Sequence, residues 1–389
     1  MSPVRSQIVQ TMRVCPPEFS QPKIVAFVSH LLPTSVLNMI SYVLGSQPAP
    51  TVWGILLLIV LALLAITKGG DMFTDSSVHI ARITKIPPLI VGATIVSMAT
   101  SFPEFMVSVT GVISGSTEFA VGNVVGSCLC NIGLIVGSCA IVRSYIAKRT
   151  NSLSGISASR EMLAGPGIFM LVTAAVTIVF SWFDSGSETE AYGFARWQAA
   201  VLLVGMFWYL AYSVKQARSA RYETSLSETS VDPKVPLSDI VRTTLTFLLA
   251  CAVVVIGSRL LVTNGESLAN MLGVPKLVLG LTLFAVGTSL PELTISMIAV
   301  LKGHEALGIG NIIGSNVLNI CWVLASCAVI KPLPISAQTV YVDLPVTMLL
   351  TVMLVALPWK NQRITTGIGW ALLAVYVVHL VGVTVASMA

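Results

Sequence analysis

Charged side chains are scarce in this chain of 389 residues. Aspartate, glutamate, lysine and arginine make up only 10% of it, whereas 55% of the residues are hydrophobic. Soluble domains carry about a quarter of their residues as charges, so this shortage argues against a soluble globular protein. The alternation of apolar and polar residues that is typical of outer-membrane strands is also absent. The hydrophobic residues instead occur in runs of about twenty, long enough for helices that cross a bilayer core of about 30 Å.

The motifs of several other protein classes are missing as well. The seven cysteines stand singly, and no histidine or cysteine pair has the spacing of a soft-metal site. Six of the cysteines lie in apolar stretches and are interpreted as small packing residues. The net charge of +5 comes without a basic cluster interleaved with aromatics, so nucleic acid is not an expected partner. Neither a cofactor nor an obligate protein partner is indicated.

The hydrophobic runs predict an all-α integral membrane protein with about ten transmembrane helices. Their expected cores are 52–67, 87–113, 119–142, 163–183, 194–214, 241–270, 275–301, 306–330, 340–358 and 364–386. The first and sixth are expected to extend into long, tilted helices. Most lysines and arginines fall in connections on one side, which the positive-inside rule assigns to the cytoplasm. A plasma membrane or a bacterial inner membrane is the expected location.

The order of these segments predicts the domain organisation. Residues 1–50 form an N-terminal segment, interpreted as a signal sequence or an extra helix; an amphipathic surface helix and an over-long start are the alternatives. Residues 51–214 are predicted to be the first transmembrane half and residues 240–389 the second. The polar stretch 215–239 is expected to be a cytoplasmic linker between the halves.

The two halves contain an internal repeat at a single offset of 188 residues. Thr100-Ser-Phe-Pro-Glu104 aligns with Thr288-Ser-Leu-Pro-Glu292, and Gly122-Asn-Val-Val-Gly-Ser127 aligns with Gly310-Asn-Ile-Ile-Gly-Ser315. About a third of the positions from 89 to 137 are identical to their partners. Five spans separate equivalent points, and an odd number reverses the direction across the membrane. The halves are therefore predicted to be inverted repeats, an architecture of secondary transporters.

Each copy of the repeat carries one glutamate deep inside an apolar span. A carboxylate at that depth is costly unless it is paired, and no lysine or arginine of the repeat helices is placed to pair with Glu104 or Glu292. Because both glutamates lack a basic partner and stand in the same repeated motif, a mobile cation is favoured as the group that balances their charge. A protonated glutamate that hydrogen-bonds at a helix interface is the alternative.

The neighbours of the glutamates favour a hard cation. Pro103 and Pro291 each remove a helix hydrogen bond and free backbone carbonyls one turn earlier. Thr100 and Thr288 precede the glutamates by four residues, on the same helix face. Their oxygens are ligands suited to Na⁺ or Ca²⁺.

The following helix of each repeat carries a polar stripe on an apolar surface. The stripes consist of Asn123, Ser127 and Asn131 in the first half and of Asn311, Ser315 and Asn319 in the second. Each set repeats every four residues and predicts a second wall for the cation site. Hydrogen bonds that only hold helices together are the alternative interpretation.

These motifs together resemble the two alpha-repeats of the cation/calcium exchanger superfamily, of the sodium/calcium exchanger type. The resemblance covers residues 92–137 and 280–325, where the G-T-S-x-P-E motif ends at Glu104 and Glu292. It implies ten helices in which broken, carboxylate-bearing helices meet at mid-membrane. It also implies Na⁺ sites and one Ca²⁺ site between the halves.

The resemblance implies a set of metal ligands as well. They are Glu104, Glu292, Thr100, Thr288, Ser127, Ser315, Asn131, Asn319, Ser97 and Ala285. The glutamates and threonines would bind Ca²⁺, and Ser97 and Ala285 would offer backbone carbonyls to two mirrored Na⁺ sites. Three positions depart from the family pattern: Cys128 stands where many members have asparagine, Ala306 where an acid often stands, and Asn319 where some have aspartate. The central site thus has two fixed acids, which leaves the ion stoichiometry open.

The expected function is that of a secondary active antiporter, not an enzyme. It would exchange Na⁺ for Ca²⁺ by alternating access, with inorganic cations and the lipid bilayer as its partners. Ca²⁺/H⁺ exchange through the same glutamates is the alternative. A cation channel and an intramembrane enzyme are more remote; membrane aspartyl proteases need paired aspartates in a Gly-Asp context, whereas both acids here are glutamates after proline.

Overall fold

The computed structural model describes residues 51–113, 115, 117–150, 155–182, 192–227, 236–272 and 287–388. Among these residues, eight helices are long and apolar enough to cross a membrane, and a pair bent by 41° forms a ninth span. The shorter apolar helix Leu290–Leu301 lies in the expected span 275–301. The all-α membrane architecture is confirmed, whereas the predicted N-terminal segment 1–50 lies outside the described residues.

The first half begins with one long helix and continues with interrupted ones. Its segments are α4 (Val52–Thr84), α5 (Pro88–Val91), η1 (Gly92–Val96), α6 (Ser97–Thr100), α7 (Phe102–Ile113), α8 (Thr117–Leu129), η2 (Cys130–Val136), α9 (Gly137–Thr150), α10 (Arg160–Met162), η3 (Leu163–Gly167), α11 (Ile168–Ser181) and α12 (Arg196–Ser227). The η segments are π-helical turns, which often mark functional positions within helices.

The second half follows the same order. Its described segments are α13 (Leu237–Met271), α16 (Leu290–Leu301), α17 (Glu305–Leu318), η5 (Asn319–Leu324), α18 (Ala325–Ile330), η6 (Thr339–Asp343), α19 (Leu344–Ala356) and α20 (Thr366–Met388). The π-helical turns η2 and η5 begin at equivalent places of the repeat, one residue before Asn131 and at Asn319. The interruption is therefore a property of the repeated sequence.

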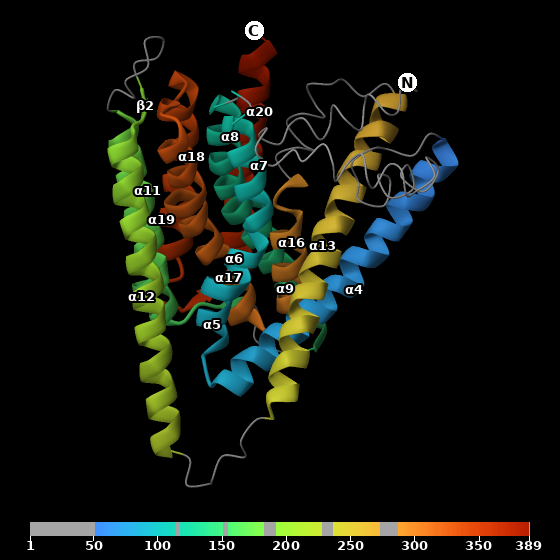
Figure 1. The fold of residues 1–389 in the computed structure, drawn as a ribbon, viewed down its shortest axis with the longest axis vertical. Coiled ribbons are helices and arrows are strands. Elements are labelled where there is room, and N and C mark those ends of the chain that lie inside the picture. Colours follow the sequence, from blue (N-terminus) through green and yellow to red (C-terminus); the bar gives the residue numbers. More distant parts are fainter. Residues whose placement is uncertain are drawn as a thin grey trace, which may run out of the picture.

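Two short antiparallel strand pairs display the inversion of the halves. β1 (Ile156–Ser157), after α9, pairs with β4 (Arg363–Ile364), before α20. β3 (Leu333–Pro334), after α18, pairs with β2 (Gly193–Phe194), before α12. Each pair thus joins the end of the third span of one half to the start of the fifth span of the other, at opposite ends of the bundle (Figure 1).

Helices extend into the predicted linker 215–239 from both sides. α12 continues through most of its polar end to Ser227, and α13 already begins at Leu237. Most of the described part of this stretch is therefore helical. Polar residues end a transmembrane span but do not end a helix, because residues such as lysine, arginine and glutamate are good helix formers in water.

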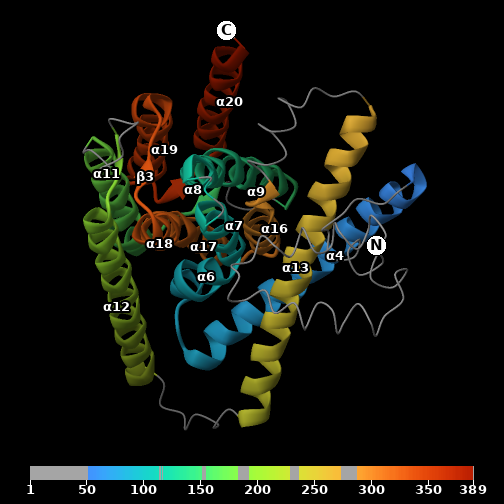
Figure 2. The ribbon, with the colours of Figure 1, turned by 45° about the horizontal axis from the view of Figure 1, so that its top comes forward.

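The two long helices α4 and α13 lie side by side, at one side of the group formed by the other helices (Figures 1 and 2). Gly69 and Gly257, equivalent residues of the repeat, form their crossing point. A Cβ atom at Gly69 would lie 2.9 Å from Val253, and one at Gly257 would lie 2.9 Å from Ile66. Small residues allow this close approach of two membrane helices, and Phe73 adds a ring contact with Phe247 at 4.5 Å between centroids.

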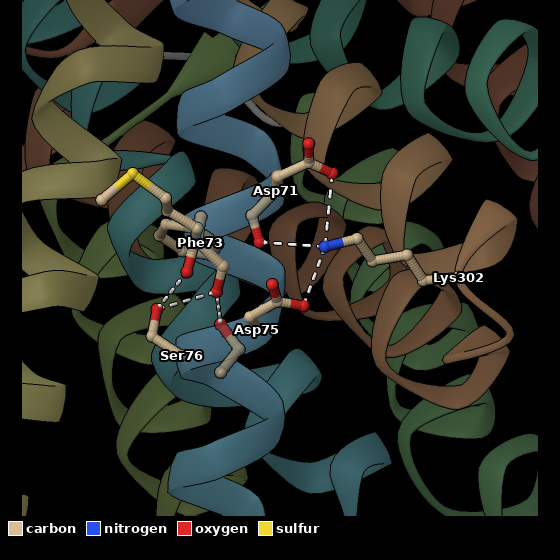
Figure 3. Close-up of polar contacts among 7 residues, drawn as sticks. Asp71, Phe73, Asp75, Ser76 and Lys302 are labelled. Atoms are coloured by element: carbon tan, nitrogen blue, oxygen red, sulfur yellow. Dashed lines mark hydrogen bonds and ion pairs between the residues drawn. The ribbon is translucent and has the colours of Figure 1, made fainter.

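An ionic clamp, made of Lys302, Asp71 and Asp75, joins α4 to the end of α16. Lys302 Nζ lies 3.2 Å from Asp71 Oδ1 and 2.8 Å from Asp75 Oδ1, and it also donates to the Asp71 carbonyl (Figure 3). Partial burial alone lowers the pKa of the Lys302 ammonium, but the hydrogen bonds to Asp75 and Asp71 outweigh burial and raise that pKa. The clamp therefore connects the long-helix pair to the rest of the protein.

Candidate cation site

Two matched helix breaks carry the predicted glutamates. Ser101 ends α6 with φ −81° and ψ −2°, and Ser289 precedes α16 with φ −91° and ψ 8°. After each break a new helix begins, with Glu104 or Glu292 in its first turn. The proline two residues after each serine, Pro103 or Pro291, lacks the N–H that would continue the preceding helix. Each carboxylate thus lies at the positive end of a helix dipole, which favours its negative charge.

The two carboxylates are fully buried and close enough to interact electrostatically. Ser101 Oγ donates to Glu292 Oε1 at 3.4 Å, but the other oxygen of Glu292 and both oxygens of Glu104 accept no hydrogen bond. No ion pair between described residues involves either glutamate. The described part of the chain also holds no group of three or more acidic, histidine or cysteine side chains. Further cation ligands must therefore be neutral oxygens.

A pair of asparagines links the two repeats across the site. Asn311 donates through Nδ2 to Ser296 Oγ at 3.0 Å, and its Oδ1 accepts from Thr100 Oγ1 at 3.2 Å. The mirrored contacts are equally long: Asn123 Nδ2 donates to Ser108 Oγ, and Thr288 Oγ1 donates to Asn123 Oδ1. Each asparagine therefore ties a threonine of the other repeat to a serine of its own. These contacts give Asn123 and Asn311 a structural role and hold the threonines in place.

Backbone contact brings α17 against the broken second span. A Cβ atom at Gly314 would lie 2.4 Å from the Ala93 carbonyl oxygen and 2.5 Å from Ser97 Oγ, and one at Gly310 would lie 2.5 Å from the Leu89 carbonyl oxygen. Only glycine, which lacks a Cβ atom, permits the two backbones to approach each other this closely. The close approach places the polar stripe of the second repeat against the carbonyls of the first.

Three further predicted ligands, Ser97, Ser127 and Ser315, are buried. The Ser97 carbonyl accepts from the amide of Ser101 at 2.9 Å and from Thr100 Oγ1 at 3.3 Å. Ser315 Oγ lies 3.4 Å from Thr100 Oγ1, whereas Ser127 Oγ has no hydrogen-bond partner. The predicted ligand Ala285 lies outside the described residues.

The two central asparagines differ from each other. Asn131 donates through Nδ2 to Asn316 Oδ1 at 3.1 Å, which leaves its own Oδ1 without a donor. Both amide atoms of Asn319 are buried and unpartnered. This contrast is the clearest departure from symmetry at the site.

Several residues at the site were missed by the sequence analysis. Ser101 contacts Glu292, and Ser108 and Ser296 contact the bridging asparagines. The repeat offset could have revealed these serines, because each has an identical partner 188 residues away. Tyr209 of α12 donates to the Ala93 carbonyl in η1 at 2.9 Å, and no repeat or motif marks it in the sequence.

Comparison with known proteins identifies the architecture. The sequence profile of the family described as sodium/calcium exchanger protein matches residues 54–215 and 242–385. The chain belongs to the sodium/calcium exchanger protein family.

Individual relatives match over nearly their whole length. The chain is 32% identical to the putative antiporter CaxA of Alkalimonas amylolytica over 82% of this chain and 95% of the relative. It is 29% identical to the sodium/calcium exchanger MaX1 of Methanosarcina acetivorans over 84% of this chain and 97% of the relative. A solved structure of the sodium–calcium exchanger NCX_Mj, soaked with 10 mM Na⁺ and zero Ca²⁺, aligns with a TM-score of 0.69 and 26% identity. It covers 84% of this chain and 98% of the NCX_Mj chain.

Family membership confirms three expectations from the sequence. The exchanger is a multi-pass membrane protein, it is a transporter and not an enzyme, and it carries out cation/Ca²⁺ antiport.

Proposed function

We propose that the exchanger couples outward or inward Ca²⁺ movement to opposite movement of Na⁺ through one shared site at Glu104 and Glu292. The observation that carries this proposal is the pair of buried carboxylates, one from each repeat, with three oxygens that accept no hydrogen bond. In a membrane interior such oxygens need a cation or a proton. Their residue types suit hard cations such as Ca²⁺ and Na⁺.

Competition for the same carboxylates accounts for exchange. Two negative charges neutralise one Ca²⁺ or two Na⁺, so the site binds one kind of cargo at a time. Thr100, Thr288, Ser127, Ser315, Asn131, Asn319 and the carbonyls of Ser97 and Ala285 would add neutral oxygens. A third Na⁺ would have to be bound by these neutral oxygens alone.

Alternating access would result from movement of the α4–α13 pair over the other helices. The packing supports this division, because α4 and α13 share a close crossing at Gly69 and Gly257. His79 Nε2 also contacts Asp239 Oδ2 at 3.1 Å, which joins the two long helices to each other. The ionic clamp, in contrast, crosses from α4 to α16 and would have to open when the pair moves.

The ionic clamp can favour only one of the two access states. In an inverted repeat, the opposite state brings together the equivalent residues of the other half. Those residues are Arg259 in place of Asp71 and Ser114 in place of Lys302, so no matching ion pair can form. The state described here is therefore the one that the clamp stabilises.

Substitution of Lys302 with methionine is expected to depopulate this state by up to about fivefold, since exposed ion pairs contribute up to about 1 kcal/mol. Half-saturating Ca²⁺ concentrations at the two faces of oriented vesicles would then change in opposite directions. Asp239→Asn is the matched control, because it changes a side-chain contact that lies within the moving pair. Equal effects of both variants would contradict this division into moving and fixed parts.

The coupling ion can be identified by ⁴⁵Ca²⁺ uptake into proteoliposomes. We expect uptake when vesicles loaded with Na⁺ are diluted into Na⁺-free medium, and no uptake when only a proton gradient is imposed. Loss of the Na⁺-driven uptake in Glu292→Gln would link the flux to the proposed site. Uptake driven by the proton gradient alone would instead identify a Ca²⁺/H⁺ exchanger, because the same carboxylates can bind protons. Current that saturates without any counter-ion would identify a channel.

A further inference from the structure

The π-helical turns η2 and η5 each bring one asparagine to the helix of the opposite repeat. The turn η2, which contains Asn131, packs against α17, and the turn η5, which contains Asn319, packs against α8. In the first contact Asn131 meets Asn316. The equivalent contact of Asn319 would be with Cys128, because Cys128 and Asn316 are separated by the repeat offset of 188 residues.

Asn131 is held in one orientation by a chain of contacts. Asn316 Nδ2 points to Met170 Sδ at 3.7 Å, so Asn316 Oδ1 is turned towards Asn131 and accepts its Nδ2–H at 3.1 Å. All three side chains are almost completely buried. Because the amide nitrogen of Asn131 is occupied in this way, its Oδ1 is left as an acceptor without a donor. That oxygen is preorganised to bind a cation.

Asn319 lacks the corresponding partner. Cys128 is buried and directly follows the predicted ligand Ser127 in α8. Its short side chain ends in a thiol, a weak donor and weak acceptor, which contacts the Asn316 carbonyl oxygen at 3.9 Å. A thiol cannot replace the amide oxygen that holds Asn131. Consequently, both amide atoms of Asn319 are buried without a partner.

We infer that Cys128 makes the two central asparagines, Asn131 and Asn319, differ in how they bind the cation. This inference rests on the proposed cation site. Asn131 is a fixed oxygen ligand, and Asn316 is its positioning residue. Asn319 is an adjustable group: it can donate through its nitrogen to a bare carboxylate, or turn its oxygen towards a bound cation. The cargo must orient Asn319 on binding, which weakens cation affinity relative to a site with two fixed amides.

A reciprocal exchange of the two residues tests this inference in the full-length exchanger. Cys128→Asn should orient Asn319 and lower the half-saturating Ca²⁺ concentration about fivefold, the effect of one net hydrogen bond. Asn316→Cys should release Asn131 and raise the half-saturating Ca²⁺ concentration about fivefold. The double variant again has one fixed and one adjustable amide and should return to within about twofold of the parent.

The controls separate this effect from general damage. Cys139→Ala, which changes a buried cysteine of α9 outside the proposed site, should leave the half-saturating Ca²⁺ concentration unchanged. If Cys128→Asn fails to fold, Asn316→Cys and its rescue by the second substitution still decide the matter. A double variant that binds Ca²⁺ more weakly than Asn316→Cys alone, or an unchanged half-saturating Ca²⁺ concentration in Asn316→Cys, would overturn the inference. Retained Ca²⁺ binding in Glu292→Gln would instead contradict the proposed site itself, so the two failures are distinguishable.

Discussion

Replacing Glu292 with glutamine is expected to reduce Ca²⁺ exchange by at least about 100-fold. The variant keeps the shape of the side chain but removes one of the two negative charges that face the cargo. Even at an effective dielectric constant of about 20, a unit charge at 4 Å contributes about 4 kcal/mol per unit charge of the cation. Glu104→Gln should have at least as large an effect, because neither of its oxygens accepts a hydrogen bond. The measurement is the initial rate of ⁴⁵Ca²⁺ uptake per folded molecule in proteoliposomes.

Glu118→Gln provides the matched control for both glutamates. Glu118 lies in the first turn of α8, in the same repeat as Glu104, but its side chain is exposed. Its replacement should leave exchange near the parental rate. Normal exchange by either Glu104→Gln or Glu292→Gln would mean that cargo does not pass between the two carboxylates, and the shared-site mechanism would be wrong.

Substitution of Gly314 with alanine is expected to cost about 3 kcal/mol or more of stability, at or beyond the usual range for overpacking. The added methyl would lie 2.4 Å from the Ala93 carbonyl oxygen and 2.5 Å from Ser97 Oγ. The nearest obstacle is a backbone atom, and it cannot move away without shifting the broken second span. We therefore expect both the folded yield and the Ca²⁺ flux to fall. The fraction of monodisperse protein that survives heating in detergent measures the first effect.

Gly205→Ala tests whether this cost is specific to the contact. Gly205 also lies in a transmembrane helix, but the nearest atom to an added Cβ would be Cys321 Sγ, at the ordinary distance of 3.7 Å. Alanine favours helix over glycine, so this variant should be neutral or slightly more stable. Equal heat resistance of the two variants would show that α17 does not approach the second span as closely as described.

The architecture of this protein and its two buried glutamates could be predicted from the amino-acid sequence alone. Hydrophobic runs long enough to span a bilayer predicted the helices, since length and polarity alone decide which segments can cross it. The repeat offset and the odd number of spans predicted the inversion. Glu104 and Glu292 could be found because a carboxylate inside an apolar span costs free energy. Its occurrence in both copies of the repeated motif therefore predicts a functional role.

Tertiary structure decided which residues of the two halves meet. The bridges from Thr100 to Asn311 and from Thr288 to Asn123 cross between repeats, and no spacing along the chain encodes such a pairing. The contact of Tyr209 with η1 likewise depends on where a distant helix packs.

The inequality of the two central asparagines has the same origin. In the sequence, Cys128 is a small departure from a motif. Only packing of each π-helical turn against the opposite repeat makes it the missing partner of Asn319. A sequence specifies local structure through its hydrophobic pattern, and it indicates special sites through the free-energy cost of burying charged groups. Hydrogen bonds between distant segments, in contrast, exist only once the helices have packed.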